Sequence, residues 1–382
     1  MKPLSPLKFF KENKRKALIS FLVLIFTVCA ISLITVLINS LTDTVVSTNL
    51  KPLENFSGVY PVNGEFYVKD SITDKLRKDQ SIEKLIPCDF DFTTVKLAIG
   101  GNTSVPVVFS DQSSHDYIME KLGDSLREGR LPESGTNEVA VHWRVAANKK
   151  WKIGDTIGNF KDEKESLTGE YKVVGIIEGP NIIFLGAESF KEKQLKQNAK
   201  TDKPLGFLIF PKEGKRDEVN KYLRSIKKTE GGSMTYESMK ELFNDIMAGL
   251  NSTILAIIII VIFILSISVG ALTYVIYIQR SDEFGILYAM GYSRKFIRRM
   301  IIKEIMSLNI ISWVAGILFS FLIIFLLNKY VYNPDGNVLT MFSVNELINT
   351  LIIPLMVGFF SIIPIILRLV KWDPVAIIER RE

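Results

Sequence analysis

Apolar and polar positions are strongly segregated along this chain. Stretches free of Asp, Glu, Lys, Arg and His occur at residues 17–41, 246–279, 305–328 and 347–367. The hydrocarbon core of a bilayer, about 30 Å thick, is crossed by about 20 apolar residues in a helix. Each stretch reaches that length, so the pattern predicts four transmembrane helices.

The first stretch is interpreted as an uncleaved anchor. It runs from residue 17 to 41, whereas the apolar region of a signal peptide is typically about 7–15 residues long. No small-x-small cleavage pattern follows it at residues 39–43.

Residues 42–245 alternate between short apolar patterns and polar turns, which predicts a mixed α+β domain. Alternating β-branched and aromatic residues predict strands at 66–69, 94–99, 105–109, 138–141, 171–177 and 207–210. A 3.6-residue apolar period predicts helices at 72–85, 114–126, 187–196 and 215–227. An amphipathic helix at 236–248 leads directly into the second apolar stretch, which alone would be about 50 Å long. We therefore expect a stalk that continues this span into the domain.

Basic residues indicate the orientation of these segments. The first sixteen residues contain one acid, Glu12, and the bases Lys2, Lys8, Lys11, Lys14, Arg15 and Lys16. The segments 280–304 and 368–382 are also rich in Lys and Arg, whereas 329–346 has the single base Lys329. Because cytoplasmic flanks carry an excess of Lys and Arg, we predict a multi-pass cell-membrane protein with both termini cytoplasmic. Residues 1–16 are expected to lie on the inner surface as an amphipathic segment.

The predicted fold is a membrane protein with four transmembrane α-helices and a large α+β extracytoplasmic domain between helices 1 and 2. The external domain with its stalk occupies 42–245, and the cytoplasmic loop occupies 280–304. A short external loop, 329–346, precedes the fourth span. The tail is 368–382.

The composition does not change this predicted organisation, and it argues against a disulfide, a metal site and a catalytic site. The chain has 382 residues, 47% of them hydrophobic, and a net charge of +6. Cys29 lies in the first apolar stretch and Cys88 in the polar domain, so a disulfide within one soluble domain is not expected. The two histidines, His115 and His142, have no cysteine partners at metal-ligand spacing. No catalytic group, metal site or cofactor site is predicted.

The four apolar stretches contain no ionisable residue. Proton-coupled pumps and secondary transporters usually place such residues at membrane depth. The pattern favours helices that transmit movement, and leaves open the alternative that all four are simple anchors for the external domain.

The cytoplasmic loop contains a short predicted helix with clear ends. Ser281 is a suitable N-cap, and Asp282 and Glu283 complement the helix dipole in the first turn. Gly291 is a suitable stop, and Ser293 is expected to cap the helix that leads into the third span.

This short helix has an apolar edge of Phe284, Leu287 and Tyr288. Gly285 and Ala289 lie four residues apart on one face and permit close approach of another backbone. We expect the helix to dock into a groove of a partner protein, with a position flat in the lipid headgroups as the alternative.

The loop pattern Arg280-x-x-Glu283-x-Gly285-Ile286-Leu287-x-Ala289-x-Gly291-x-Ser293, followed by Glu304, resembles that of FtsX/MacB-type ABC transporter permeases. Segments 129–132, 137–141, 152–157 and 171–176 resemble the MacB-like extracytoplasmic core domain, and 373–379 resembles the ending of the family. Tyr288 and Tyr292 stand where smaller or basic residues are commoner in the family.

The resemblance implies a permease dimer, formed with a second copy or a paralogue, in which each permease binds a cytoplasmic ABC ATPase. The ATPase contact would be formed by Glu283, Phe284, Gly285, Leu287, Tyr288, Ala289 and Gly291. The chain has no Walker A motif and only sixteen residues before its first span. We therefore expect the ATPase, and the ATP, on a separate chain, and no catalysis by this one.

The expected function is export or extrusion of a peptide, lipopeptide or lipid-linked cargo, driven by ATP through mechanotransmission to the external domain. An FtsX-like relay that activates an external partner such as a cell-wall hydrolase is the first alternative. A membrane-anchored receptor domain is the second. No nucleic-acid partner is expected.

Overall fold

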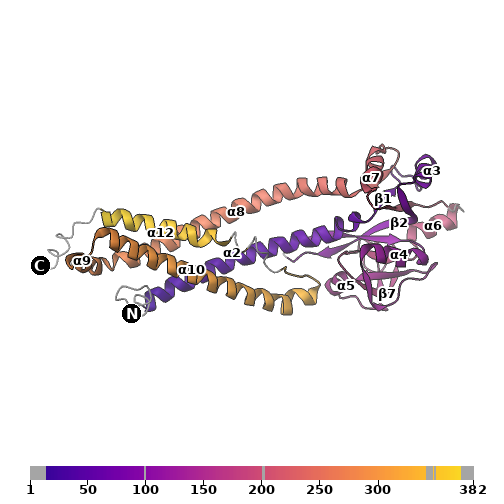
Figure 1. The fold of residues 1–382 in the computed structure, drawn as a ribbon. Helices are drawn as coiled ribbons and strands as arrows, with labels where there is room; N and C mark the ends of the chain where they lie inside the picture. Colours follow the sequence, from indigo (N-terminus) through magenta and orange to yellow (C-terminus); the bar gives the residue numbers. More distant parts are fainter. Residues whose placement is uncertain (1–13, 99, 200–202, 341–346, 348–349, 371–382) are drawn as a thin grey trace. The chain divides into compact units, whose positions relative to one another are not determined.

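A computed structural model describes residues 14–98, 100–199, 203–340, 347 and 350–370 (Figure 1). The chain divides into two compact units. The helical unit comprises Met1–Ile38, Gly249–Leu327 and Thr340–Glu382, and the α/β unit comprises Asn39–Ala248 and Asn328–Leu339. Parts of the predicted segments 1–16, 329–346 and 368–382 lie outside the described residues.

Four long apolar helices are described: α2 (Lys14–Asn49), α8 (Tyr236–Ile278), α10 (Arg294–Leu327) and α12 (Ile352–Val370). Among the described residues, three helical segments are long and apolar enough to cross a membrane, namely Leu18–Asn49, Leu255–Ile278 and Arg294–Asp335. The fourth apolar segment, Ile352–Leu367, is shorter. Three of the four predicted spans are thus confirmed in length and composition, and the fourth, at 347–367, stays a prediction.

The helices of the helical unit pack closely where glycine meets a neighbour. A Cβ on Gly316 of α10 would lie 2.8 Å from the Cβ of Val28 on α2, and one on Gly270 of α8 would lie 3.0 Å from Phe360 on α12. Such close approach is typical of helices in membranes, where small residues let backbones meet. Trp313 of α10 adds a hydrogen bond of 3.0 Å to the hydroxyl of Thr350.

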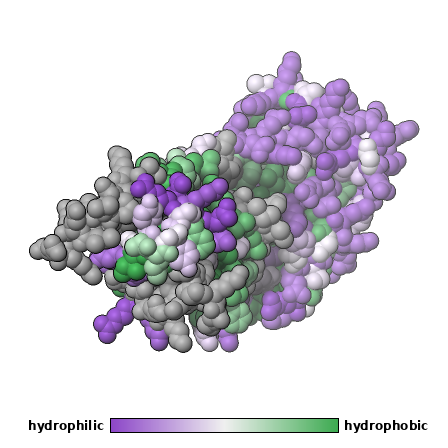
Figure 2. All heavy atoms as spheres, turned by 60° about the vertical axis from the view of Figure 1, so that its left-hand side comes forward, coloured by the Kyte–Doolittle hydropathy of each residue, from purple (hydrophilic) through white to green (hydrophobic). Residues whose placement is uncertain are grey.

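The outward sides of these helices stay apolar. On the part of α8 that belongs to the helical unit, the exposed large apolar side chains are Leu255, Ile257, Ile259, Ile260, Phe263, Ile264, Ile267 and Val275. In Figure 2 the hydrophobic residues (green) gather over the helical unit, while polar residues (purple) cover much of the α/β unit. A water-exposed helix would not carry such a continuous apolar surface.

Helix α8 is continuous from Tyr236 to Ile278. It includes the predicted amphipathic segment 236–248 and most of the predicted second span, so the expected continuity of these two segments is confirmed. The segment has no proline to interrupt the backbone hydrogen bonds.

The α/β unit is built on one mixed sheet with the order β10-β1-β9-β2-β3-β8-β5-β7-β4, and β6 pairs with β7. Its strands are β1 (Ser57–Tyr60), β2 (Ile82–Lys96), β3 (Asn102–Phe109), β4 (Ser125–Gly129), β5 (Glu138–His142), β6 (Thr156–Ile157), β7 (Tyr171–Glu178), β8 (Phe184–Gly186), β9 (Gly206–Pro211) and β10 (Gly232–Met234). The β3–β8 and β5–β7 pairs are parallel, and the others are antiparallel.

Five α-helices accompany this sheet: α3 (Asp70–Lys78), α4 (Gln112–Leu122), α5 (Trp143–Lys149), α6 (Phe190–Ala199) and α7 (Arg216–Ser225). The short 3-10 helices η1 (Pro52–Glu54) and η3 (Asn333–Asp335) and the π-helix η2 (Asn328–Tyr332) also belong to this unit.

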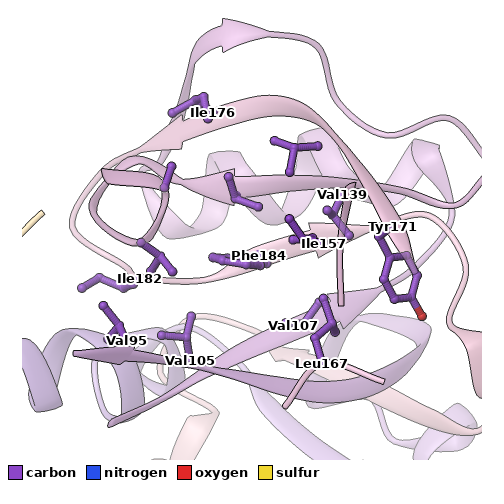
Figure 3. Close-up of a cluster of buried hydrophobic side chains, with 14 of the residues drawn as sticks. Val95, Val105, Val107, Val139, Ile157, Leu167, Tyr171, Ile176, Ile182 and Phe184 are labelled. Carbon is purple, nitrogen blue, oxygen red and sulfur yellow. The ribbon is translucent and has the colours of Figure 1, made fainter. Parts of the chain in front are cut away.

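Strand β2 joins the two halves of the sheet. Its first part pairs with β9, with Ile86 opposite Leu208, and its second part pairs with β3, with Val95 opposite Thr103. Next to it, Figure 3 shows the buried cluster in which Val107, Phe184 and Tyr171 converge. The hydroxyl of Tyr171 accepts a hydrogen bond of 2.7 Å from the Phe190 N–H, so its polar atom is satisfied.

The predicted strands at 138–141, 171–177 and 207–210 are confirmed as β5, β7 and β9, and the helix at 215–227 as α7. The predicted strand at 66–69 is wrong, because β1 forms earlier, at Ser57–Tyr60. The helices predicted at 72–85 and 114–126 were too long. Helix α3 ends before β2 begins, and α4 ends where Gly123 adopts a left-handed conformation with φ of +68°.

His142 is fully buried at the start of α5. Its Nδ1 accepts a hydrogen bond of 3.3 Å from the Arg144 N–H, and its Nε2 lies 3.3 Å from the Gly179 carbonyl oxygen. This arrangement suits the neutral ring with its proton on Nε2. Burial lowers the pKa of His142 to about 4.

We predict that the α/β unit loses stability as pH falls from about 6.5 towards 4. In that window the unfolded histidine binds a proton that the folded one does not, because the folded pKa is the lower one. At pH 5 the loss due to His142 should be about 2 kcal/mol. His142→Asn keeps a capping oxygen for the Arg144 N–H and should remove this part of the pH dependence of stability. Hydrogen exchange of β5 amides in the full chain, compared at pH 7 and 5, measures the difference.

The comparison with His142→Asn is needed because Asp124 acts in the opposite direction. Burial raises the pKa of Asp124 to about 6, so its ionisation destabilises the folded unit as pH rises. If the stability of the wild type and of His142→Asn changes equally with pH, His142 does not titrate as its burial implies.

Candidate functional site

The helix predicted in the cytoplasmic loop is present as α9 (Ser281–Ala289). Its N-cap position is Arg280, not the predicted Ser281, which lies in the first turn. Gly291 has a φ of +90° and follows the end of the helix, as predicted. The hydroxyl of Ser293 accepts a hydrogen bond of 3.2 Å from the Phe296 N–H, which confirms Ser293 as the cap of α10.

One side of α9 faces the interior of the helical unit. Phe284 is 3% exposed and Gly285 is also buried. The Phe284 ring packs in an apolar cluster with Tyr277, Ile297, Met300, Ile301, Ile305 and Ile365. The predicted apolar edge is therefore divided, because Phe284 faces inward, Leu287 is half-buried and Tyr288 is exposed.

The opposite side of α9 presents apolar side chains to the surroundings. Ile286 is 58% and Met290 is 62% exposed, and Tyr288 lies between them in the sequence. Ile286 and Met290 were not predicted as site residues, although their spacing of four residues puts them on one face of a helix. The predicted residues Glu283, Ala289 and Gly291 are also exposed.

A buried ion pair fixes the start of α9. The Arg280 side chain is 8% exposed and the Glu304 side chain 3%. Arg280 Nη1 donates to Glu304 Oε2 at 2.9 Å, and its Nε donates to Glu283 Oε2 at 2.9 Å. The Tyr277 hydroxyl donates to the same Glu304 oxygen at 3.2 Å. These bonds tie together the end of α8, the start of α9 and the first turns of α10.

Two aromatic rings complete this cluster. The rings of Tyr277 and Phe284 are stacked, with centroids 6.4 Å apart and planes 11° apart. The Arg280 guanidinium carbon lies 5.2 Å from each centroid. A cation over an aromatic face gains about 0.5–2 kcal/mol, more when it is desolvated. The inner side of α9 is thus held by both charge and packing, which leaves its outer side as a fixed platform.

The surroundings of the platform are basic. Arg294 lies over the Tyr288 ring at 5.6 Å, and Lys295, Arg299 and Lys303 are exposed along α10. Within the described ranges there is no group of His, Cys, Asp or Glu that could hold a metal ion.

Comparison with known proteins gives a match to a family model. Residues 255–374 match the family model described as FtsX-like permease C-terminal. This range includes α9 and its buried ion pair.

Two relatives are both named putative hemin transport system permease protein HrtB. The protein from Staphylococcus epidermidis is 20% identical over 377 residues, which cover 97% of this chain and 96% of the relative. The one from Staphylococcus haemolyticus is 25% identical over 288 residues, covering 71% and 73%.

Among solved structures, the periplasmic region of MacB from Actinobacillus actinomycetemcomitans aligns with 14% identity and a TM-score of 0.29, over 51% of this chain and 96% of that one. The extracellular domain of the transporter YknZ from Gram-positive bacteria aligns with 12% identity and a TM-score of 0.27, over 51% and 94%.

We predict unequal effects for the two acids that pair with Arg280. Glu304→Gln removes the buried partner and should destabilise the helical unit by about 3 kcal/mol, because it leaves an uncompensated buried charge. Glu283→Gln removes a half-exposed partner and should cost less than about 1 kcal/mol. Thermal unfolding of the detergent-solubilised chain compares the two variants. Equal losses would mean that the ion pair does not hold α9.

Proposed function

We propose that this chain is an ABC transporter permease of the FtsX/MacB type, which converts ATP hydrolysis on a separate subunit into movement of its α/β unit. The observation that carries the proposal is the geometry of α9. A short helix braced from behind by Arg280 and Glu304 exposes Ile286, Tyr288 and Met290 to a partner. A rigid apolar anchor of this kind is what a protein–protein hot spot requires.

We propose a revised set of residues for the ATPase contact. Glu283, Tyr288, Ala289 and Gly291 are accessible, and Leu287 is accessible in part. Phe284 and Gly285 are proposed to support the contact from inside the permease. Ile286 and Met290 join the contact as its apolar centre.

The proposed orientation puts α9 and both termini in the cytoplasm and the α/β unit outside. The basic flanks of the spans support it. Helix α8, which is continuous from Tyr236 to Ile278, supports the proposed transmission. We propose that two permeases, as copies or paralogues, act with a pair of ATPase subunits.

The cargo is proposed to be a peptide, a lipopeptide or a lipid-linked molecule. The relatives add hemin as a specific candidate, because both carry the name of a hemin transport permease. Hemin shares with lipid-linked cargo a large apolar body and a charged edge. Such molecules partition into the bilayer and do not need ionisable groups within the described spans.

We predict that Ile286→Asp and Met290→Asp weaken ATPase binding by about tenfold or more, since an apolar anchor at a hot spot is worth about 2 kcal/mol or more. The measurement is co-purification with the full chain from gently solubilised membranes, with the bound protein identified by its Walker motif. Ile153→Asp is the matched control, because Ile153 is an exposed apolar residue of the α/β unit. Retention of the ATPase by both α9 variants would contradict this contact.

We also predict that hemin stimulates ATP hydrolysis by the complex reconstituted in lipid nanodiscs. The reason is that cargo stabilises the conformation in which the ATPase pair closes. Ile286→Asp should abolish the stimulation. Stimulation by a lipopeptide and none by hemin would assign the cargo to the peptide or lipid class instead.

A further inference from the structure

The start of α5 is bonded to two segments that lie far from it in the sequence. Arg144 Nε donates to the Gly336 carbonyl oxygen at 3.0 Å, and its Nη2 donates to the Thr44 hydroxyl oxygen at 3.0 Å. Thr44 belongs to α2, and Gly336 follows η3 in the turn after α10. All three residues belong to the α/β unit.

The bond to Thr44 has one possible direction. The Thr44 hydroxyl already donates to the Ser40 carbonyl oxygen at 2.8 Å. A hydroxyl has a single proton and two acceptor lone pairs, so Thr44 can only accept from Arg144. Thr44 is 4% exposed, so water does not compete readily for this bond.

Gly336 fits against α5 because it has no side chain. Its φ is +68°, and a Cβ would lie 1.8 Å from the Arg144 carbonyl oxygen. One turn later on α5, Asn148 Nδ2 donates to the Asp335 carbonyl oxygen at 2.9 Å. The Asn148 side chain also pairs with the backbone of Lys96, accepting from its N–H at 3.0 Å and donating to its carbonyl oxygen at 3.2 Å.

The turn that meets α5 is closed at its base. Asn328 accepts from the Leu339 N–H and donates to the Leu339 carbonyl oxygen, both at 2.8 Å. Residues 328–339 are thereby held as one compact turn, which presents Asp335 and Gly336 to α5.

We propose that Arg144 and Asn148 form a coupling clasp, through which movement of α10 and α2 reaches the sheet of the α/β unit. This inference rests on the proposed function. Helix α8 continues into the α/β unit through the peptide chain and needs no clasp to move it. Helix α2 also continues through the chain, but its contact with α5 is the Thr44–Arg144 bond. The chain continues from the turn after α10 to residue 340 and not into the sheet. Movement of this turn therefore reaches the sheet through the side chains of Arg144 and Asn148. Arg144 and Asn148 are positioning residues, and their contacts connect the turn with β5 and with β2.

The test uses the full chain in complex with its ATPase in nanodiscs, with hydrogen exchange followed in nucleotide-free and vanadate-trapped states. In the wild type, exchange should change both in α9 and in α5. Gly336→Ala and Arg144→Gln should speed exchange of 143–149 and 333–337 by about tenfold, the factor for losing one charge-assisted hydrogen bond. The nucleotide response of α5 should vanish, while α9 keeps its response and ATP hydrolysis persists.

Gly214→Ala is the matched control for Gly336→Ala. Gly214 has a φ of +73°, and a Cβ there would meet nothing within 4 Å. Gly214→Ala therefore imposes the same backbone cost without a clash like that between a Cβ at 336 and Arg144. In this variant α5 should respond to nucleotide as in the wild type.

The outcomes separate the clasp from the function on which it rests. No nucleotide response of α9 in the wild type would overturn the proposed function. A response of α9 together with an undiminished response of α5 in both variants would overturn the clasp. If either variant loses protection from hydrogen exchange throughout β5 and β7, a third variant, Thr44→Val, is used to test the clasp. It keeps the volume of Thr44 and removes the acceptor, so a full α5 response in that variant also overturns the clasp.

Discussion

The buried ion pair between Arg280 and Glu304 is the interaction on which the rest of the candidate site depends. A guanidinium and a carboxylate removed from water are tolerated only when each is fully bonded, and here Tyr277 and Glu283 supply the remaining partners. With the charges satisfied, the Phe284 ring can stack on Tyr277 and close the cluster. The direction of α9, and therefore the set of residues on its outer side, follows from that arrangement.

The two units use different means to hold their parts together. The helical unit relies on close approach at glycines and on a few internal hydrogen bonds, because its outward surface must remain apolar. The α/β unit buries its side chains within a mixed sheet, where β2 serves both halves. The polar contacts of Arg144 and Asn148 belong to this second unit, where a surrounding aqueous phase makes exposed hydrogen-bonding groups inexpensive.

Much of this organisation was predictable from the sequence, and the failures have physical reasons. Long uncharged runs identify membrane helices, and Gly291 and Ser293 mark the ends of α9 and α10 through local backbone preferences. The inward position of Phe284 was not predictable, because the period of a nine-residue helix reveals an apolar stripe but not which side its own protein covers. The pairing of Arg280 with Glu304, and the division of β2 between two partners, depend on tertiary contacts that no local pattern encodes.

The pairing of β1 gives the α/β unit a late folding step. Gly58 lies opposite Met234 and Leu208 in the sheet, so this part of the sheet closes only after a long stretch of chain has been synthesised. Contacts of such sequence separation are slow to form, because the entropy of loop closure is lost first. The carbonyl oxygen that Arg144 bonds belongs to Gly336, later still in synthesis. Until that turn is synthesised, α5 lacks one of its hydrogen-bond partners.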